Sequence, residues 1–229
     1  MAESTILYYI TDRKAFPGDD HTRRIRLLEK IAEAARAGID YIQLREKDLS
    51  ARELESLARE ANLIIRDHNK LRPENRELKT SLLINSRIDI ALAAAAAGVH
   101  FPANDIAPSE VRAAWKCGAG TPARENLPRD PLISISCHSP EEVAQVAVNC
   151  ADLALFAPVF EKKDAPGVAS TGLDALRLAC HSKIPVLALG GITLQNAESC
   201  LQAGAAGLAA IRLFQENNID EIASAFRKR

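Results

Sequence analysis

The feature that most constrains the fold is a pattern repeated eight times along the chain, in which a short apolar run precedes an amphipathic segment. Several runs follow a small residue at a helix end, as Ile39 follows Gly38 and Val99 follows Gly98. Glycine relieves the left-handed cap of a helix, and continuous apolar runs are typical of parallel strands covered on both faces. The predicted strands are 6–11, 39–45, 81–85, 98–101, 132–136, 152–157, 185–189 and 207–211. The predicted helices are 22–37, 50–67, 88–96, 108–116, 139–149, 172–181, 194–203 and 218–227.

Eight strand–helix units within 229 residues favour one domain over residues 1–229, folded as a (β/α)8 TIM barrel. An open, doubly wound sheet is the second choice, because it would not normally need eight strands of such even spacing. The least patterned regions, 68–80 and 117–131, are interpreted as surface excursions rather than as domain linkers.

Composition excludes several classes of protein. The net charge is −1 and aromatic residues make up 4% of the chain, so neither a nucleic-acid partner nor a membrane surface is expected. The five cysteines contain no C-x-x-C pair, which fits reduced thiols in the cytoplasm better than disulfides or a zinc site. The first apolar run, 6–10, has neither a basic leader nor the length of a membrane span. Helix faces on barrels often pair, so a homodimer is the expected assembly.

Polar side chains gather where the predicted strands end, which is where such barrels carry their chemistry. Alternation along the second strand puts Gln43, Arg45 and Lys47 on one side, and Arg and Lys both suit an anion. The simpler interpretation is a strand that runs out into a solvated turn. The candidates at the other strand ends are Asn85, Asp105, Ser136, His138, Glu161, Gly190, Gly191 and Arg212.

Gly190 and Gly191 follow the seventh predicted strand and precede a predicted helix. Backbone N–H groups exposed by two glycines, next to a helix N-terminus, favour a phosphate, and phosphate sites after strands 7 and 8 recur in this architecture. The alternative is a tight turn that needs positive φ. Arg212, one strand further on, could hold the same anion or pair with a neighbouring carboxylate.

Six short motifs in the same order resemble those of thiamine phosphate synthases and their TenI-type relatives. The resemblance covers nearly the whole chain and implies a (β/α)8 barrel that binds a thiazole phosphate. The motifs are Gln43-Leu44-Arg45-Glu46-Lys47, Leu83-Ile84-Asn85, Gly98-Val99-His100, Ser136-x-His138-Ser139-x-Glu141-Glu142, Pro158-Val159-Phe160 and Leu189-Gly190-Gly191-Ile192.

The resemblance implies two activities. In the synthase branch, hydroxymethylpyrimidine diphosphate is joined to thiazole phosphate with Mg²⁺ as cofactor. Gln43, Arg45, Lys47 and Asn85 would then hold the diphosphate, and Asp105 would be a metal ligand. In the TenI branch, a thiazole phosphate carboxylate is tautomerised to its aromatic form. That reaction needs a general acid/base and no cofactor, and His138 would carry the proton.

Departures from the synthase pattern favour the tautomerase. Ser86 replaces an Asp that would bind Mg²⁺, and a hydroxyl is a poor substitute for that carboxylate. The segment that begins Phe160-Glu161 is closer to the TenI-like members, and Arg212 replaces a usual Ser. Asp105 and the complete Gln-x-Arg-x-Lys set favour the alternative, a synthase with an altered metal site. A third hypothesis is a non-catalytic barrel that binds a phosphate ligand and acts as a sensor.

Several candidates also have a structural interpretation. His138 could cap the helix that follows it, Asp105 could be a turn residue, and Glu161 could orient a substrate or pair with a neighbouring lysine. Cys137 points away from Ser136 and His138 on a regular strand, which predicts a core position. The loop 161–171 is a candidate lid over the site.

Overall fold

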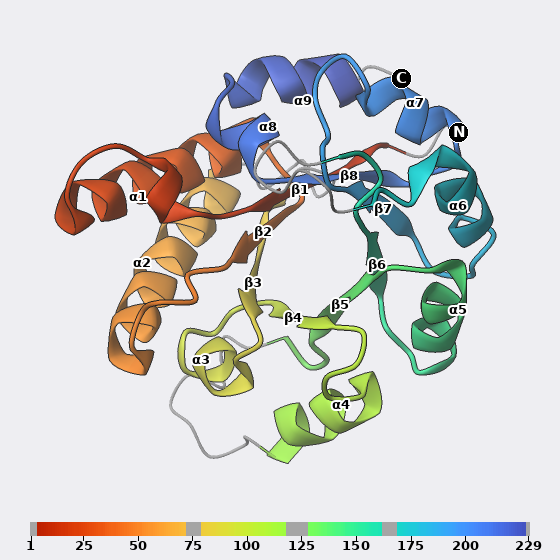
Figure 1. The fold of residues 1–229 in the computed structure, drawn as a ribbon. Helices are drawn as coiled ribbons and strands as arrows, with labels where there is room; N and C mark the ends of the chain where they lie inside the picture. Colours follow the sequence, from red (N-terminus) through yellow and green to blue (C-terminus); the bar gives the residue numbers. More distant parts are fainter. Residues whose placement is uncertain (1–3, 72–78, 118–127, 162–168, 228–229) are drawn as a thin grey trace.

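The protein is a closed barrel of eight parallel strands, in the order β1 to β8, with β8 paired to β1. The computed structural model describes residues 4–71, 79–117, 128–161 and 169–227. Figure 1 looks along the barrel, with the strands in the middle and the helices around them. The strands are Ile6–Ile10, Tyr41–Leu44, Ser81–Asn85, Gly98–Pro102, Leu132–Cys137, Leu153–Phe156, Val186–Leu189 and Gly207–Ala210. The predicted (β/α)8 barrel is therefore confirmed.

Helices follow the strands and cover the outside of the barrel (Figure 1). The main ones are α1 Asp20–Ala37, α2 Ala51–Lys70, α3 Ile88–Ala93, α4 Pro108–Cys117, α5 Pro140–Val148, α6 Gly172–Ala179, α7 Ala197–Gln202 and α9 Ile219–Arg227. Two short elements are additional to the sequence prediction: a 3₁₀ turn, η1 Arg13–Ala15, and a short helix, α8 Arg212–Gln215. The predicted excursions 68–80 and 117–131 lie partly outside the described residues, as does most of the candidate lid 161–171.

Local chemistry explains where the long helices begin and end. Ser50 and Glu53 form the capping box at the start of α2, each side chain bonding the other's backbone N–H. At the end of α1, Gly38 takes φ +75°, a left-handed conformation that glycine adopts without steric cost. The caps that the sequence predicts at the start of α2 and at the end of α1 are therefore present.

The core has two layers because side chains alternate across each strand. Leu7 and Tyr9 point outwards and pack with the helices, whereas Tyr8 and Ile10 point into the barrel. Apolar side chains such as Leu155 fill the interior further along. Cys137 belongs to the outer layer and is fully buried, as predicted. The interior also contains buried polar groups near the carboxyl ends of the strands, and these groups build the site.

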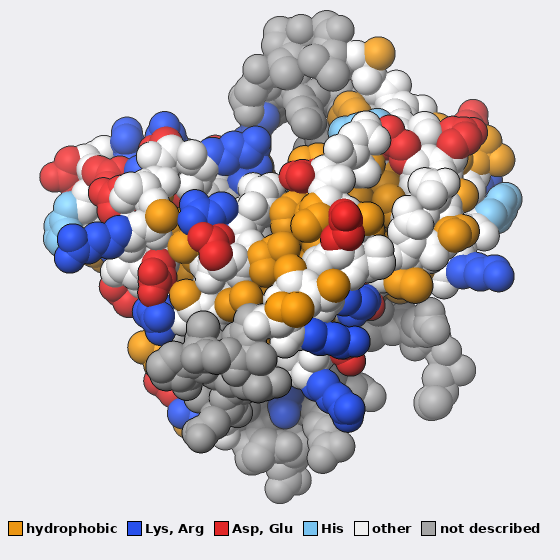
Figure 2. Space-filling view, turned by 90° about the horizontal axis from the view of Figure 1, so that it is seen from below, with side chains coloured by type: hydrophobic (Ala, Val, Ile, Leu, Met, Phe, Trp, Pro, Cys, Tyr) orange, Lys and Arg blue, Asp and Glu red, His pale blue; other side chains and the backbone are white. Residues whose placement is uncertain are grey.

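On the face shown in Figure 2, Lys and Arg side chains alternate with Asp and Glu around a band of apolar side chains. Outside the grey parts, no large patch of one charge covers this face, in agreement with a net charge of −1. No helix in the described ranges has the length and apolar character needed to cross a membrane.

Candidate active site

A cavity of about 650 Å³ opens at the carboxyl ends of the strands. Its wall is mixed: apolar side chains such as Ile10 and Leu189 alternate with polar groups from β2, β4, β5 and the loops that follow β6, β7 and β8. Most of the predicted site residues lie together in this wall, although they are far apart in the sequence. They are Gln43, Arg45, Ser136, His138, Glu161, Gly190, Gly191 and Arg212.

His138 immediately follows β5 and is exposed at the cavity wall. Its ring Nδ1 lies 2.7 Å from the carbonyl oxygen of Ala157. A carbonyl can only accept, so Nδ1 carries a hydrogen and donates it. In the neutral ring this leaves Nε2 as the basic nitrogen. The backbone N–H of His138 donates to Glu142 Oε2 at 2.7 Å, while Ser139 caps α5. The predicted capping role therefore falls to Ser139, not to the His138 ring.

Gly190 and Gly191 form the part of the wall that follows β7, and both have positive φ, +97° and +66°. A Cβ on Gly190 would lie 2.8 Å from Pro158 Cα, and one on Gly191 would lie 2.7 Å from the carbonyl oxygen of Glu161. Close approach of the loop after β6 therefore requires glycine at both positions, besides the turn that the sequence suggested.

The helix expected directly after the glycines begins later than predicted. Residues 194–196 form a turn, in which the Asn196 side chain accepts from the Thr193 N–H and donates to the Gly191 carbonyl. Helix α7 starts only at Ala197. The expectation that its N-terminus adjoins Gly191 is wrong, because the turn satisfies these backbone groups without a helix.

Arg212 is the first residue of α8, which follows β8 after the single residue Ile211. No capping residue in the sequence indicated so short a helix, and no side-chain cap bond is present at its start. A short extra helix after strand 8 is a recurrent feature of barrels that bind phosphate. Arg212 lines the cavity together with the glycine turn, because it follows β8, the strand paired to β7.

The strand-2 motif is divided between the cavity and the protein interior. Gln43 is buried, and its Nε2 donates to Asn85 Oδ1 at 2.8 Å, while Gln43 Oε1 accepts no hydrogen bond from the described residues. Arg45 is half-buried and lines the cavity. Lys47 is exposed and does not line the cavity. Asn85 does not line the cavity either, but it accepts a hydrogen bond from Gln43, which does. Strand β2 ends at Leu44, so the predicted alternation does not extend to residue 47.

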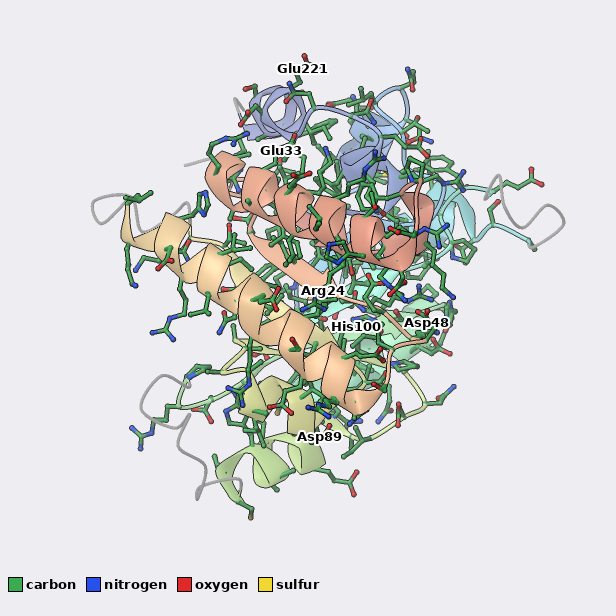
Figure 3. All side chains as sticks on the ribbon, turned by 90° about the vertical axis from the view of Figure 1, so that its left-hand side faces the viewer. Arg24, Glu33, Asp48, Asp89, His100 and Glu221 are labelled. Carbon is green, nitrogen blue, oxygen red and sulfur yellow. The ribbon has the colours of Figure 1, made fainter. Side chains whose placement is uncertain are left out.

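Glu46 anchors the turns after β1 and β2. Its carboxylate is buried and accepts from the Thr11 hydroxyl at 2.7 Å and from the Arg13 N–H. The Arg13 guanidinium bonds Glu46 as well and holds Asp48 by two bonds of 2.7 and 2.8 Å. Burial raises the pKa of Glu46, whereas the bonds from Arg13 lower the pKa of Asp48. In Figure 3, Asp48 lies at the edge where α2 begins.

His100 is a buried part of the wall for which the sequence suggested no definite role. Its Nδ1 lies 2.9 Å from Ser134 Oγ, and its Nε2 lies 2.9 Å from Ser136 Oγ. Burial, assisted by the nearby charge of Arg45, lowers the pKa of His100 to about 3, so the ring is neutral. The usable sequence signal was the alternation of polar residues, Ser134 and Ser136, in a strand otherwise made of apolar residues.

The residues that a magnesium site would use do not come together here. Asp105 is exposed, does not line the cavity and accepts from the Ile106 N–H. The Ser86 hydroxyl accepts from Asn85 Nδ2 at 3.2 Å. No group of three His, Cys, Asp or Glu residues placed to hold an ion occurs in the described ranges. Mg²⁺ is usually bound by one or two carboxylates together with substrate phosphates, and Ser86 supplies no carboxylate to such a set.

Fold and cavity together define a (β/α)8 barrel protein with a polar site at the carboxyl ends of its strands. A family model described as thiamine monophosphate synthase matches residues 7–214. The match spans all eight strands except the first residue of β1. The chain belongs to the thiamine phosphate synthase/TenI family.

Individual relatives agree with this assignment. The chain is 35% identical to a putative thiamine-phosphate synthase 2 of Aquifex aeolicus, over 92% of this chain and 97% of that protein. It is 36% identical to a thiamine-phosphate synthase of Syntrophomonas wolfei, over 90% and 86%. A solved thiamine phosphate pyrophosphorylase from Pyrococcus furiosus superposes with a TM-score of 0.74 at 26% identity, covering 99% and 95%. These names describe synthases, so they give no support to the tautomerase over the synthase.

Proposed function

We propose that this protein acts in thiamin biosynthesis and tautomerises a thiazole phosphate carboxylate to its aromatic form. The observation that carries the proposal is the orientation of His138. Its Nδ1–H is held by the Ala157 carbonyl, so the neutral ring presents Nε2 as the base. Family membership supports the thiamin pathway and a thiazole phosphate ligand.

In this reaction, Nε2 of His138 takes a proton from one atom of the thiazole ring and returns it to another. The imidazolium formed between these steps keeps its bond to the Ala157 carbonyl, which fixes the ring and stabilises the positive charge. The reaction releases no group and consumes no co-reactant. One side chain with a basic nitrogen at the cavity wall is therefore sufficient for the proton transfer.

The rest of the wall provides positions for the two anionic groups of such a substrate. Gly190 and Gly191 line the cavity, where backbone N–H groups of the turn after β7 could bind a phosphate, and Arg212 adds a guanidinium from the neighbouring strand end. Arg45 lies on the β2 side of the same cavity, where it could bind the carboxylate.

A thiamine phosphate synthase is the second candidate. The names of the relatives favour it, as does the bonded pair of Gln43 and Asn85 beside Arg45, a polar set that would suit a diphosphate. The donor set around Ser86 argues against it. Ser86 has φ +55°, a conformation in which Asp is commonly found, so Ser86→Asp should be accommodated without strain. A gain of synthase activity and of Mg²⁺ response in Ser86→Asp would favour this candidate, and an unchanged Mg²⁺ response would count against it.

The deciding experiment is a product assay with both substrates. Purified protein is given the non-aromatic thiazole phosphate carboxylate alone, and separately the aromatic thiazole phosphate with hydroxymethylpyrimidine diphosphate, each with Mg²⁺ or with chelator. Conversion of the first substrate that is indifferent to chelator is the expected result. Mg²⁺-dependent thiamine phosphate from the second pair, without the first reaction, would contradict the proposal. No product from either, with tight binding of thiazole phosphate, would identify a non-catalytic binding barrel.

A further inference from the structure

A chain of hydrogen bonds crosses the barrel interior and ends at the cavity. The Tyr8 hydroxyl lies 2.9 Å from Ser134 Oγ, Ser134 Oγ lies 2.9 Å from His100 Nδ1, and His100 Nε2 lies 2.9 Å from Ser136 Oγ. The first three groups are fully or almost fully buried, whereas Ser136 is half-buried and lines the cavity. In Figure 3, His100 lies in the interior, behind the helices α1 and α2.

Each member of this chain carries one exchangeable hydrogen. Burial raises the pKa of Tyr8, which keeps its phenol protonated, and lowers the pKa of His100 to about 3, which leaves one hydrogen on the ring. Three hydrogen bonds join four groups, so three of the four hydrogens lie between neighbours. The remaining hydrogen therefore belongs to Tyr8, Ser134 or Ser136 and points away from the chain.

The two ends of the chain differ in what surrounds them. A leftover hydrogen on Tyr8 or Ser134 would be buried, and neither side chain has a hydrogen-bond partner outside this chain among the described residues. A buried donor without an acceptor loses its hydration and gains nothing in return. At the Ser136 end, the hydrogen would point towards a cavity that water or a ligand can enter. The hydrogen bonds are therefore expected to run from Tyr8 to Ser136, with each group donating to the next.

We infer that Tyr8, Ser134 and His100 form a directional relay that makes Ser136 a hydrogen-bond donor to an anionic oxygen of the ligand. In this direction the Tyr8 hydroxyl donates to Ser134, Ser134 donates to His100 Nδ1, and His100 Nε2–H donates to Ser136. The Ser136 hydroxyl then has its hydrogen for the cavity, beside the cation of Arg45. His100 is a positioning residue, because it acts through Ser136. The inference depends on the proposed function only for the identity of the ligand.

The relay makes a spectroscopic prediction for the unmodified protein. His100 should be the Nε2–H tautomer, whereas His138 should be the Nδ1–H tautomer, because a carbonyl holds its Nδ1. Long-range ¹⁵N–¹H correlation spectra of the ¹⁵N-histidine-labelled protein at about pH 8, above the ordinary histidine pKa, distinguish the two tautomers. The His100 signals are assigned by their loss in His100→Gln.

The two histidines separate the two proposals within one spectrum. An Nδ1–H tautomer at His100 would overturn the relay and leave the proposed function untouched. An Nε2–H tautomer at His138 would remove the basis of the proposed function and leave the relay untouched. Because the spectrum needs neither substrate nor turnover, failure of the enzymatic assay has no bearing on it.

Binding of simple anions tests the consequence of the relay. Inorganic phosphate and acetate are titrated separately against wild type, Ser136→Ala and Ser136→Thr. Loss of a donor to a charged group should weaken binding of at least one anion about tenfold in Ser136→Ala, and Ser136→Thr should restore it, since threonine keeps the hydroxyl. The anion affected shows whether Ser136 binds a phosphate or a carboxylate. Unchanged affinity of Ser136→Ala for both anions would overturn the inference.

Discussion

Two regions at the carboxyl ends of the strands use their polar groups in opposite ways. After β1 and β2, Arg13 bonds both Glu46 and Asp48, so these charges serve to hold two turns together. After β5, His138 makes one ring bond to a backbone carbonyl and keeps its second nitrogen at the cavity wall. The more highly charged region is therefore the structural one, and the chemically useful group lies in the less charged region.

Because Arg13 holds the turns after β1 and β2 together, we expect its removal to cause the largest loss of stability. In Arg13→Ala, the Glu46 carboxylate stays buried without its guanidinium partner, although the Thr11 hydroxyl and a backbone N–H still donate to it. Breaking a buried ion pair on one side should lower the free energy of unfolding by about 3 kcal/mol. Urea denaturation measures this loss. A matched control is Arg59→Ala, which removes an exposed pair with Glu55 and should cost at most about 0.5 kcal/mol. Equal losses in the two variants would refute the anchor role.

A methyl group on the glycine turn should give the next largest effect. Gly191→Ala combines positive φ with a Cβ only 2.7 Å from Phe160 Cβ, so we expect a loss of about 2 kcal/mol and a deformed cavity wall. Gly172→Ala is the control, because Gly172 also has positive φ, +79°, but no atom of the described residues lies within 4 Å of an added Cβ. That variant should lose about 1 kcal/mol through its backbone conformation alone.

Thermal and urea unfolding of both glycine variants separate the two contributions. If Gly191→Ala loses no more stability than Gly172→Ala, the close approach of the loop after β6 does not constrain the glycine turn. Phosphate affinity gives a second readout. It should fall in Gly191→Ala and stay at the wild-type value in Gly172→Ala, because Gly172 does not line the cavity.

The smallest predicted effect comes from replacing Asp48, which should change how the free energy of unfolding depends on pH. Hydrogen bonds from Arg13 lower its pKa in the folded state, so its contribution is present above the ordinary pKa of about 4 and is lost as pH falls. The side chain is 38% exposed, which limits the contribution to about 1 kcal/mol at neutral pH. Asp48→Asn should be less stable than wild type at pH 7, and the difference should shrink progressively below about pH 4. A constant difference at all pH values would contradict this assignment.

The fold was predictable because a short, mainly apolar run marks each strand. All eight predicted strands occur, and alternation correctly placed Cys137 in the outer core. Helix α8 was missed because no capping residue precedes Arg212. The late start of α7 was missed because the turn at Thr193 depends on a side-chain bond to Asn196 that periodicity does not reveal.

The site was predictable where a residue directly follows a strand, as His138 does, and less so further along a loop. Lys47 and Asp105 were expected at the site, but the first lies beyond the end of the alternating strand and the second in an exposed turn. His100 was undecided because its partners come from another strand. Its distance to Ser134 and Ser136 depends on the pairing of β4 with β5, which the sequence does not state.

Proton transfer by His138 is tested by the rate at which His138→Ala converts the non-aromatic thiazole phosphate carboxylate, compared with wild type and with His181→Ala. His181 is exposed beyond the end of α6, outside the cavity wall, so its variant controls for the loss of a histidine. We expect kcat to fall at least about 100-fold in His138→Ala, the size typical of general acid/base catalysis, while phosphate affinity and the free energy of unfolding stay close to wild type. Undiminished turnover in His138→Ala would contradict proton transfer by His138.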